Sequence, residues 1–147
     1  VKCAIGKRGI SIKKREGDNI TPRGTFGFKG LFYRKDRVAK IKSNLKINAI
    51  NKNMGWCDDI RSNHYNKLVF FPFNLKAEQL MIKSNIYDII LPLNFNTRPI
   101  IKNKGSAIFL HVATKKYKPT RGCIAISKLN LKKLIRLINK KSKITIF

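Results

Sequence analysis

The sequence predicts a mainly β domain with one C-terminal helix and one short helix. Short apolar stretches alternate with clusters of glycine, proline, asparagine and aspartate, which is typical of all-β proteins. Only one long segment, near the C-terminus, repeats its apolar residues at helical spacing. The chain has 147 residues and contains no internal repeat or low-complexity linker. That length is usual for one domain, so residues 1–147 are expected to share a single core.

The expected strands are apolar or alternating segments spread along the chain: residues 1–6, 10–15, 25–34, 44–50, 68–73, 87–95, 107–113 and 143–147. Residues 16–24 are dense in turn-forming residues, and residues 51–67 are expected to form a long ordered loop. Residues 76–84 have the apolar spacing of a short helix. These segments together give the mainly β prediction.

The C-terminal helix is predicted for residues 127–141, because the apolar residues of this segment fall mostly on one helical face. Those residues are Leu129, Leu131, Leu134, Ile135 and Ile138. Ser127 stands just before the first of them and is a suitable N-cap.

The charge balance favours contact with polyanions. The chain has 33 lysine and arginine residues against 7 aspartate and glutamate residues, a formal net charge of +26. A nucleic-acid binder and an enzyme near an anionic cell envelope would both carry such a surface. The abundance of Lys, Ile and Asn also fits AT-rich codon usage. The basic residues form no arm or stripe, and no RNP-type aromatic signature is present, so no specific nucleic-acid partner is expected.

Membrane, metal and disulfide signals are weak. No apolar run is long enough to cross a bilayer, and the first residues lack the apolar core of an export signal. No cluster has metal-ligand spacing, so neither a metal nor another cofactor is expected. The three cysteines are an odd number, which leaves at least one thiol free. Cys3 and Cys57 could pair with each other, but the sequence gives no geometry for a bond.

Residues 105–127, GSAIFLHVATKKYKPTRGCIAIS, raise the question of a nucleophilic site. Strand alternation places Phe109 and His111 on one face of residues 107–113. A histidine in an apolar strand is usually a half-buried packing residue, and a free cysteine is usually a small buried hydrophobe. The turn that contains Cys123 changes this balance, because it places the thiol at the mouth of a strand.

The turn Thr120-Arg121-Gly122-Cys123 has the composition of a nucleophilic centre. Gly122 permits a bend that would aim consecutive N–H groups at one point, as in an oxyanion hole. The positive charge of Arg121 would favour a thiolate, and His111 could take up the thiol proton. On this basis Cys123 is expected to be alkylated faster than Cys3 and Cys57.

Two segments carry a family resemblance. Residues 111–126, HVATKKYKPTRGCIAI, resemble the His…Ser/Thr-x-Gly-Cys signature of YkuD-type L,D-transpeptidase catalytic domains. Residues 15–26, REGDNITPRGTF, resemble the G-x-x-x-T-P-x-G-x-F/Y segment of the same family. The intervening GWCDDIRSNHYNK and YDIILPLNF…GSAIFLHVA resemble its compact proteobacterial branch. The chain departs from the family at Ala125, where Arg or Asn is common, and at Val112, where glycine is common.

The resemblance implies a β-sandwich or barrel fold and acyl transfer on peptidoglycan stem peptides. It maps the nucleophile to Cys123, the base to His111 and the turn glycine to Gly122, with a backbone carbonyl orienting the imidazole. It also implies a role in peptidoglycan biosynthesis and cell shape, a periplasmic or cell-envelope location, a monomeric state and inhibition by carbapenems. Water as the acceptor would instead give an L,D-carboxypeptidase or endopeptidase. A non-catalytic peptidoglycan- or nucleic-acid-binding module is the remaining alternative.

The resemblance and the position of the loops suggest a further set of substrate-binding residues: Thr120, Asp58, Tyr65, Asn66 and Tyr117. Asp59 is interpreted as a loop-folding residue, and Trp56 as a core anchor. His64 is the only rival base in the chain, but it lies in a polar loop without a nearby nucleophile motif.

Overall fold

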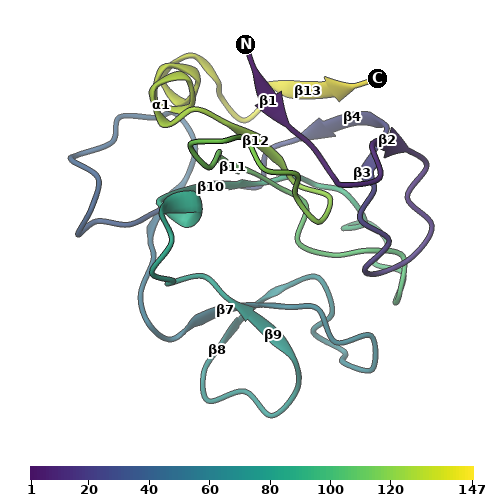
Figure 1. Ribbon diagram of the computed structural model, residues 1–147. Coiled ribbons are helices and arrows are strands. Elements are labelled where there is room, and N and C mark those ends of the chain that lie inside the picture. Colours follow the sequence, from purple (N-terminus) through teal and green to yellow (C-terminus); the bar gives the residue numbers. More distant parts are fainter.

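The computed structural model describes residues 1–147 and is built around a six-stranded sheet (Figure 1). Its strand order is β1-β12-β11-β10-β5-β6. The strands of this sheet are β1 (Cys3–Ala4), β5 (Leu31–Tyr33), β6 (Ile47–Ala49), β10 (Ile89–Pro92), β11 (Phe109–Val112) and β12 (Ile124–Ile126). All pairs are antiparallel except β11 with β12 and β5 with β6, which are parallel.

Three smaller sheets and two helices surround the central sheet. The small sheets pair β13 with β4, β2 with β3, and β8 with β7 with β9. The remaining elements are β2 (Ile10–Ser11), β3 (Thr21–Pro22), β4 (Gly24–Gly27), β7 (Met54–Cys57), β8 (Leu68–Phe70), β9 (Ala77–Gln79), η1 (Asn85–Tyr87), α1 (Lys128–Leu137) and β13 (Lys143–Ile146). The mainly β prediction is therefore confirmed.

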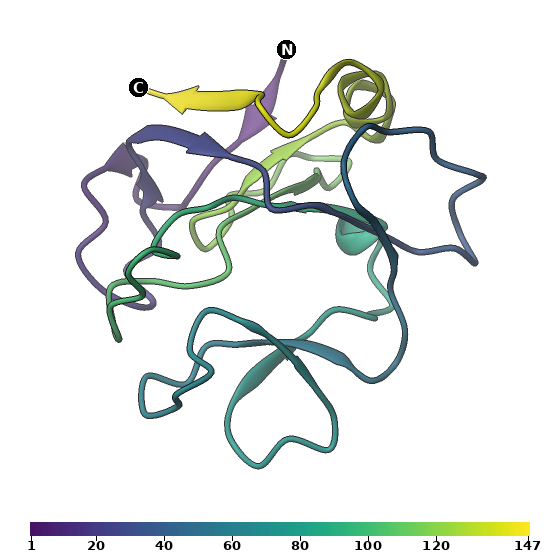
Figure 2. The same cartoon turned by 180° about the vertical axis from the view of Figure 1, so that it is seen from behind.

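The central sheet separates two layers. Helix α1 and strand β13 lie on one side of it, and η1 with the β7–β9 sheet lies on the other (Figures 1 and 2). Strand β11 is buried on both faces, so its residues pack into two different clusters. Leu110 and Val112 join the larger core beneath α1, whereas Phe109 joins the smaller core toward β7–β9. The alternation predicted for this strand is thus confirmed.

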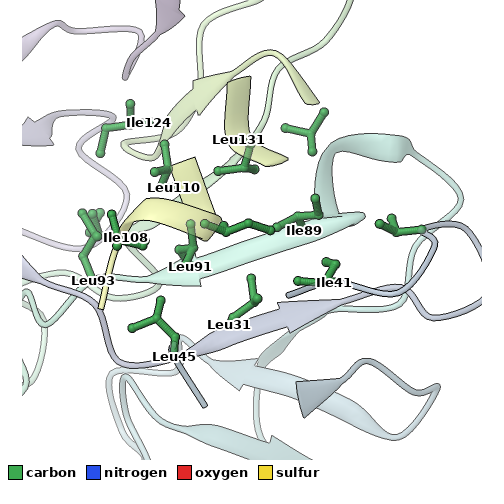
Figure 3. Close-up of a cluster of buried hydrophobic side chains, with 14 of the residues drawn as sticks. Leu31, Ile41, Leu45, Ile89, Leu91, Leu93, Ile108, Leu110, Ile124 and Leu131 are labelled. Atoms are coloured by element: carbon green, nitrogen blue, oxygen red, sulfur yellow. The ribbon is translucent and has the colours of Figure 1, made fainter. Parts of the chain in front are cut away.

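The larger core fixes α1 against the sheet. Leu131 from the helix packs with Leu110 and Ile124 from the two parallel strands (Figure 3). The Ser127 hydroxyl accepts the N–H of Asn130 at 3.2 Å, so the predicted N-cap is confirmed. The helix ends at Leu137, earlier than the sequence pattern indicated. Because α1 follows β12 directly, its packing also fixes the strand that comes after the turn of residues 120–123.

Two predicted elements are wrong. Residues 76–84 do not form a helix, because Ala77–Gln79 pair with β7 as strand β9. The short helix lies further along the chain, as the 3₁₀ turn η1. Residues 51–67 are not entirely loop, since Met54–Cys57 form the central strand of the small sheet. Pairing with segments distant in sequence outweighs the weak local pattern in both places.

Candidate active site

His111 and Cys123 share one face of the parallel pair β11–β12. His111 is opposite Ala125 in the register, which places Cys123 opposite Phe109, two residues back on the same face. The Phe109 N–H donates to Cys123 Sγ at 3.4 Å, in agreement with this register. One strand spacing and two residues of rise separate the two Cα atoms by roughly 8 Å. The fold therefore brings these two side chains together across a gap of eleven intervening residues in the chain.

The thiol of Cys123 is buried, contrary to the expected position at an exposed mouth. Cys123 is 8% exposed and belongs to the hydrophobic core cluster that contains Phe109 and Trp56. Sγ donates to the Ala107 carbonyl oxygen at 3.2 Å. Burial raises the pKa of Cys123 to about 12, with a further increase from the charge of Glu78. The resting thiol is therefore protonated at pH 7, and the charge of Arg121 is not among the causes that act on its pKa.

The imidazole of His111 is held by a backbone carbonyl, as the family resemblance implied. Its Nδ1 lies 2.9 Å from the Val112 carbonyl oxygen. A carbonyl can only accept a hydrogen bond, so Nδ1 carries the proton and Nε2 is left as the basic nitrogen. Burial lowers the pKa of His111, while the Val112 hydrogen bond opposes that change. The ring is neutral at pH 7, which is the state that a general base requires.

The turn before β12 depends on a glycine. Gly122 has φ of +138°, and a Cβ there would lie 2.9 Å from the Ile20 carbonyl oxygen. The Thr120 hydroxyl accepts the Gly122 N–H at 3.1 Å and donates to the Cys123 carbonyl at 2.6 Å. The amides of Arg121 and Cys123 have no hydrogen-bond partner. These two amides, rather than that of Gly122, are the free donors of the turn.

A buried lysine, not expected from the sequence, lies near Ile20, the residue that Gly122 approaches. Lys13 is 5% exposed, and its Nζ pairs with Asp18 Oδ1 at 2.5 Å and lies 3.5 Å from the Ile20 carbonyl oxygen. Its methylenes fill the space where a side chain at Gly105 would stand. Lys13, and not the exposed Arg121, is the cation that lowers the pKa of Cys123 against the effect of burial. Nothing in ISIKKR distinguishes Lys13 from the surface lysines beside it.

The Asp18→Asn variant should unfold far more readily than the wild type. Burial alone would raise the pKa of Asp18, but Lys13 and three backbone amides lower it to about 2. Removing this carboxylate leaves the Lys13 charge buried without a partner, a loss of about 3–5 kcal/mol in the free energy of unfolding. Urea denaturation at pH 7 measures the change. The wild-type contribution is fully present above pH 3.8 and is lost as the pH falls through about 2.

Asp58→Asn is the matched control for this prediction. Asp58 also pairs with a lysine, Lys76, at 3.7 Å, but the Lys76 side chain is 74% exposed, so no buried cation is left behind. The substitution should change the urea midpoint only slightly. Equal losses in Asp18→Asn and Asp58→Asn would contradict a special role for the buried pair.

The chain matches a known family over almost its whole length. The model of the YkuD family, the L,D-transpeptidase catalytic domain, matches residues 1–146. The chain belongs to this family. It is therefore an L,D-transpeptidase-type enzyme, and its function is related to peptidoglycan. No curated protein and no solved structure gives a significant match.

Two of the residues expected to bind substrate have polar groups that are already paired within this L,D-transpeptidase domain. Asn66 Oδ1 accepts the Trp56 indole N–H at 3.0 Å and the Ala107 N–H at 3.1 Å. The Tyr65 hydroxyl donates to Glu16 and accepts the Gly105 N–H at 2.9 Å. These bonds hold residues 105–107, whose last carbonyl receives the Cys123 thiol. Trp56 is 6% exposed, so its interpretation as a core anchor is confirmed.

The other expected binding residues lie around the turn and on the small sheet. The Thr120 hydroxyl makes its hydrogen bonds within the turn, to Gly122 and Cys123. The Lys2 ammonium lies over the Tyr117 ring, with Nζ 4.8 Å from the ring centroid. Asp58 follows β7, and its Oδ1 is buried without a hydrogen-bond partner. Its Oδ2 lies 3.7 Å from Lys76 Nζ.

The remaining candidates are structural in this domain. Asp59 binds the Arg61 guanidinium at 2.7 Å and two backbone amides, which agrees with its interpretation as a loop-folding residue. The His64 ring packs on Phe73. All three cysteines are free thiols, so Cys3 and Cys57 are not paired. No group of three His, Cys, Asp or Glu side chains could hold a metal ion.

In the resting enzyme, Cys3 should react with iodoacetamide faster than Cys123. Cys3 is exposed, whereas Cys123 is buried and its pKa is raised to about 12. A thiol with that pKa is ionised to only about one part in 10⁵ at pH 7. Peptide mass spectrometry at fixed times gives site-resolved rates. Faster labelling of Cys123 at pH 7 would show that the thiol is open and activated before any substrate binds.

Proposed function

We propose that this protein is a cysteine L,D-transpeptidase that acts on peptidoglycan stem peptides through a thioester on Cys123. The observation that carries the proposal is the shared face of β11 and β12, where a neutral imidazole with a free Nε2 lies near a thiol. The Thr120-to-Cys123 turn, which ends at the thiol residue, contains two amides without a hydrogen-bond partner. These are the three groups that acyl transfer needs: a nucleophile, a base and oxyanion donors.

The first half-reaction begins with a protonated Cys123 thiol and a neutral His111 imidazole. Cys123 Sγ attacks the carbonyl of the third stem residue as His111 Nε2 takes the thiol proton, so an S–C bond forms while the carbonyl oxygen becomes an oxyanion. The N–H groups of Arg121 and Cys123 are the donors available to that oxyanion. The C–N bond then breaks, and Nε2 returns its proton to the departing D-amino acid.

The two side chains must approach each other for this step. In the resting structure the thiol bonds to Ala107 and the imidazole to Val112, and no hydrogen bond joins Sγ to Nε2. A rotation of the Cys123 side chain away from the Ala107 carbonyl brings it toward His111 on the same sheet face. Catalytic hydrogen bonds of this kind often tighten only when substrate is present.

The second half-reaction regenerates the thiol. The amine of another stem peptide loses a proton to His111 Nε2 and attacks the thioester carbonyl, which forms a C–N bond. The C–S bond then breaks, and Nε2 returns the proton to Cys123 Sγ. Water in place of the amine gives an L,D-carboxypeptidase or endopeptidase with the same acyl-enzyme. The net charge of +26 favours the anionic cell envelope as the place of action, in agreement with the envelope association of the family. No helix of the structure is long and apolar enough to cross a membrane.

Incubation with a disaccharide-tetrapeptide tests the proposal. Mass spectrometry of the products separates the outcomes: a cross-linked dimer identifies a transpeptidase, and a tripeptide with free D-amino acid identifies a carboxypeptidase. An unchanged substrate, with the protein still folded by circular dichroism, would leave only the non-catalytic binding module. The same assay with a carbapenem added should lose both products, because a strained β-lactam carbonyl acylates the same thiol.

A further inference from the structure

The Tyr87 ring packs against both His111, the candidate base, and Phe109, the residue opposite Cys123 on β11. Its ring meets the His111 ring edge to face, with centroids 5.5 Å apart, and meets the Phe109 ring at 6.0 Å. Phe109 in turn donates its N–H to Cys123 Sγ. The aromatic side chain of η1 therefore covers both residues of β11 that face the site.

The hydroxyl of Tyr87 is anchored in a different sheet. It donates to Glu78 Oε1 at 2.5 Å, and Glu78 belongs to β9. The β7–β9 sheet stands apart from the central sheet, on the side of η1 (Figures 1 and 2). The Tyr87–Glu78 hydrogen bond thus ties the small sheet to the catalytic face of the central sheet, immediately beside His111.

This anchor is unusual in so basic a chain. Glu78 is one of only 7 acidic residues, and it is half-buried. Burial raises the pKa of Glu78, its bond to Tyr87 lowers it, and the charges of Asp58, Arg121 and Glu16 act on it from around the site. Burial also raises the pKa of Tyr87, and the charge of Cys123 adds to that increase. The charge of Glu78 in turn raises the pKa of Cys123.

We propose that Tyr87, anchored by Glu78, is a positioning residue that fixes the imidazole plane of His111 and so aims Nε2 at Cys123. The hydrogen bond to the Val112 carbonyl holds one ring nitrogen, but as a single contact it does not by itself fix the tilt of the ring. Contact with the Tyr87 ring removes that freedom, and the hydrogen bond to Glu78 removes the freedom of Tyr87. The proposal rests on His111 being the base of the proposed function.

Imidazole NMR gives a readout that does not depend on activity. The chain has 2 histidines, so ¹⁵N spectra of the wild type and of His64→Gln assign His111 directly. The wild type should show one His111 tautomer, with the proton on Nδ1. Tyr87→Phe and Glu78→Ala should show a mixture of the two tautomers, because the anchor is lost. Glu78→Gln keeps an acceptor oxygen and should retain the single tautomer.

The same variants separate positioning from general stability. Acylation of Cys123 should slow by about tenfold or more in Tyr87→Phe and Glu78→Ala, since small misplacements of a catalytic group are costly. Glu78→Gln should stay within about threefold of the wild type. Tyr33→Phe is the matched control, because Tyr33 is half-buried on β5 and its hydroxyl has no hydrogen-bond partner.

The outcomes are distinguishable from a failure of the proposed function. A single Nδ1–H tautomer and a wild-type acylation rate in Tyr87→Phe would overturn the positioning role, and so would a Glu78→Gln variant that behaves like Glu78→Ala. If the wild type forms no acyl-enzyme at all, the proposed function fails, and the tautomer spectra alone still decide whether Tyr87 fixes His111.

Discussion

Cys123→Ala should lose all acyl transfer while keeping its fold. The proposed thioester can form only on Cys123 Sγ, so the variant should have no residual acyl transfer. The fold should survive, because the side chain is small and gives up only the contacts of Sγ with Phe109 and Ala107. The expected stability loss is about 1–2 kcal/mol. Product analysis with the disaccharide-tetrapeptide, together with thermal unfolding, measures both quantities.

Cys123→Ser and Cys3→Ala complete this comparison. Serine preserves the shape and the hydrogen bond to Ala107, so inactive Cys123→Ser rules out a packing defect as the cause. Cys3 is exposed and outside the site, and its substitution should leave turnover unchanged. Turnover that persists in Cys123→Ala, or that disappears in Cys3→Ala, is incompatible with the proposed nucleophile.

His111→Ala should slow acylation of Cys123 by about 10²–10⁴-fold, the usual contribution of a positioned acid–base group. The resting thiol is protonated, so attack requires a base to remove its proton in the same step. Because burial lowers the pKa of His111, the base stays neutral somewhat below the ordinary histidine value of 6.5. The acid limb of the wild-type pH–rate profile should therefore lie below pH 6.5 and should vanish in the variant.

His64→Ala is the control for this second prediction. His64 is the other histidine of the chain and packs on Phe73 in a separate loop. Its substitution should change neither the rate nor the acid limb. A shift of the acid limb in His64→Ala, with His111→Ala unaffected, would transfer the role of base to His64.

Local patterns in the sequence were sufficient where burial alternates along a strand or around a helix. The two faces of β11 and the cap of α1 at Ser127 were predicted correctly for that reason. Strand β8 lies within the strand predicted for residues 68–73, but β7 and β9 were missed, because they are short and their pairing joins segments that are distant in sequence. Residues 77–79 form a strand because this pairing outweighs the helical spacing of the apolar residues in 76–84.

The site was predictable in its residues but not in its environment. The motif located His111 and Cys123, yet the turn composition indicated an exposed, activated thiol. The structure buries it, because residues 105–107 and the Trp56 cluster cover it. Lys13 can be buried only because Gly105 has no side chain. The two residues are more than ninety positions apart in the chain, so no local sequence pattern could have predicted this contact.

The central claim is a thioester on one particular cysteine, and trapping it is the most direct test. The protein is mixed with disaccharide-tetrapeptide, quenched in acid within seconds, digested and mapped by mass spectrometry. We expect the mass of the acyl tripeptide on the peptide that contains Cys123, absent in Cys123→Ser and strongly reduced in His111→Ala. An adduct on Cys3 or Cys57, or released product without any adduct on Cys123, would contradict it.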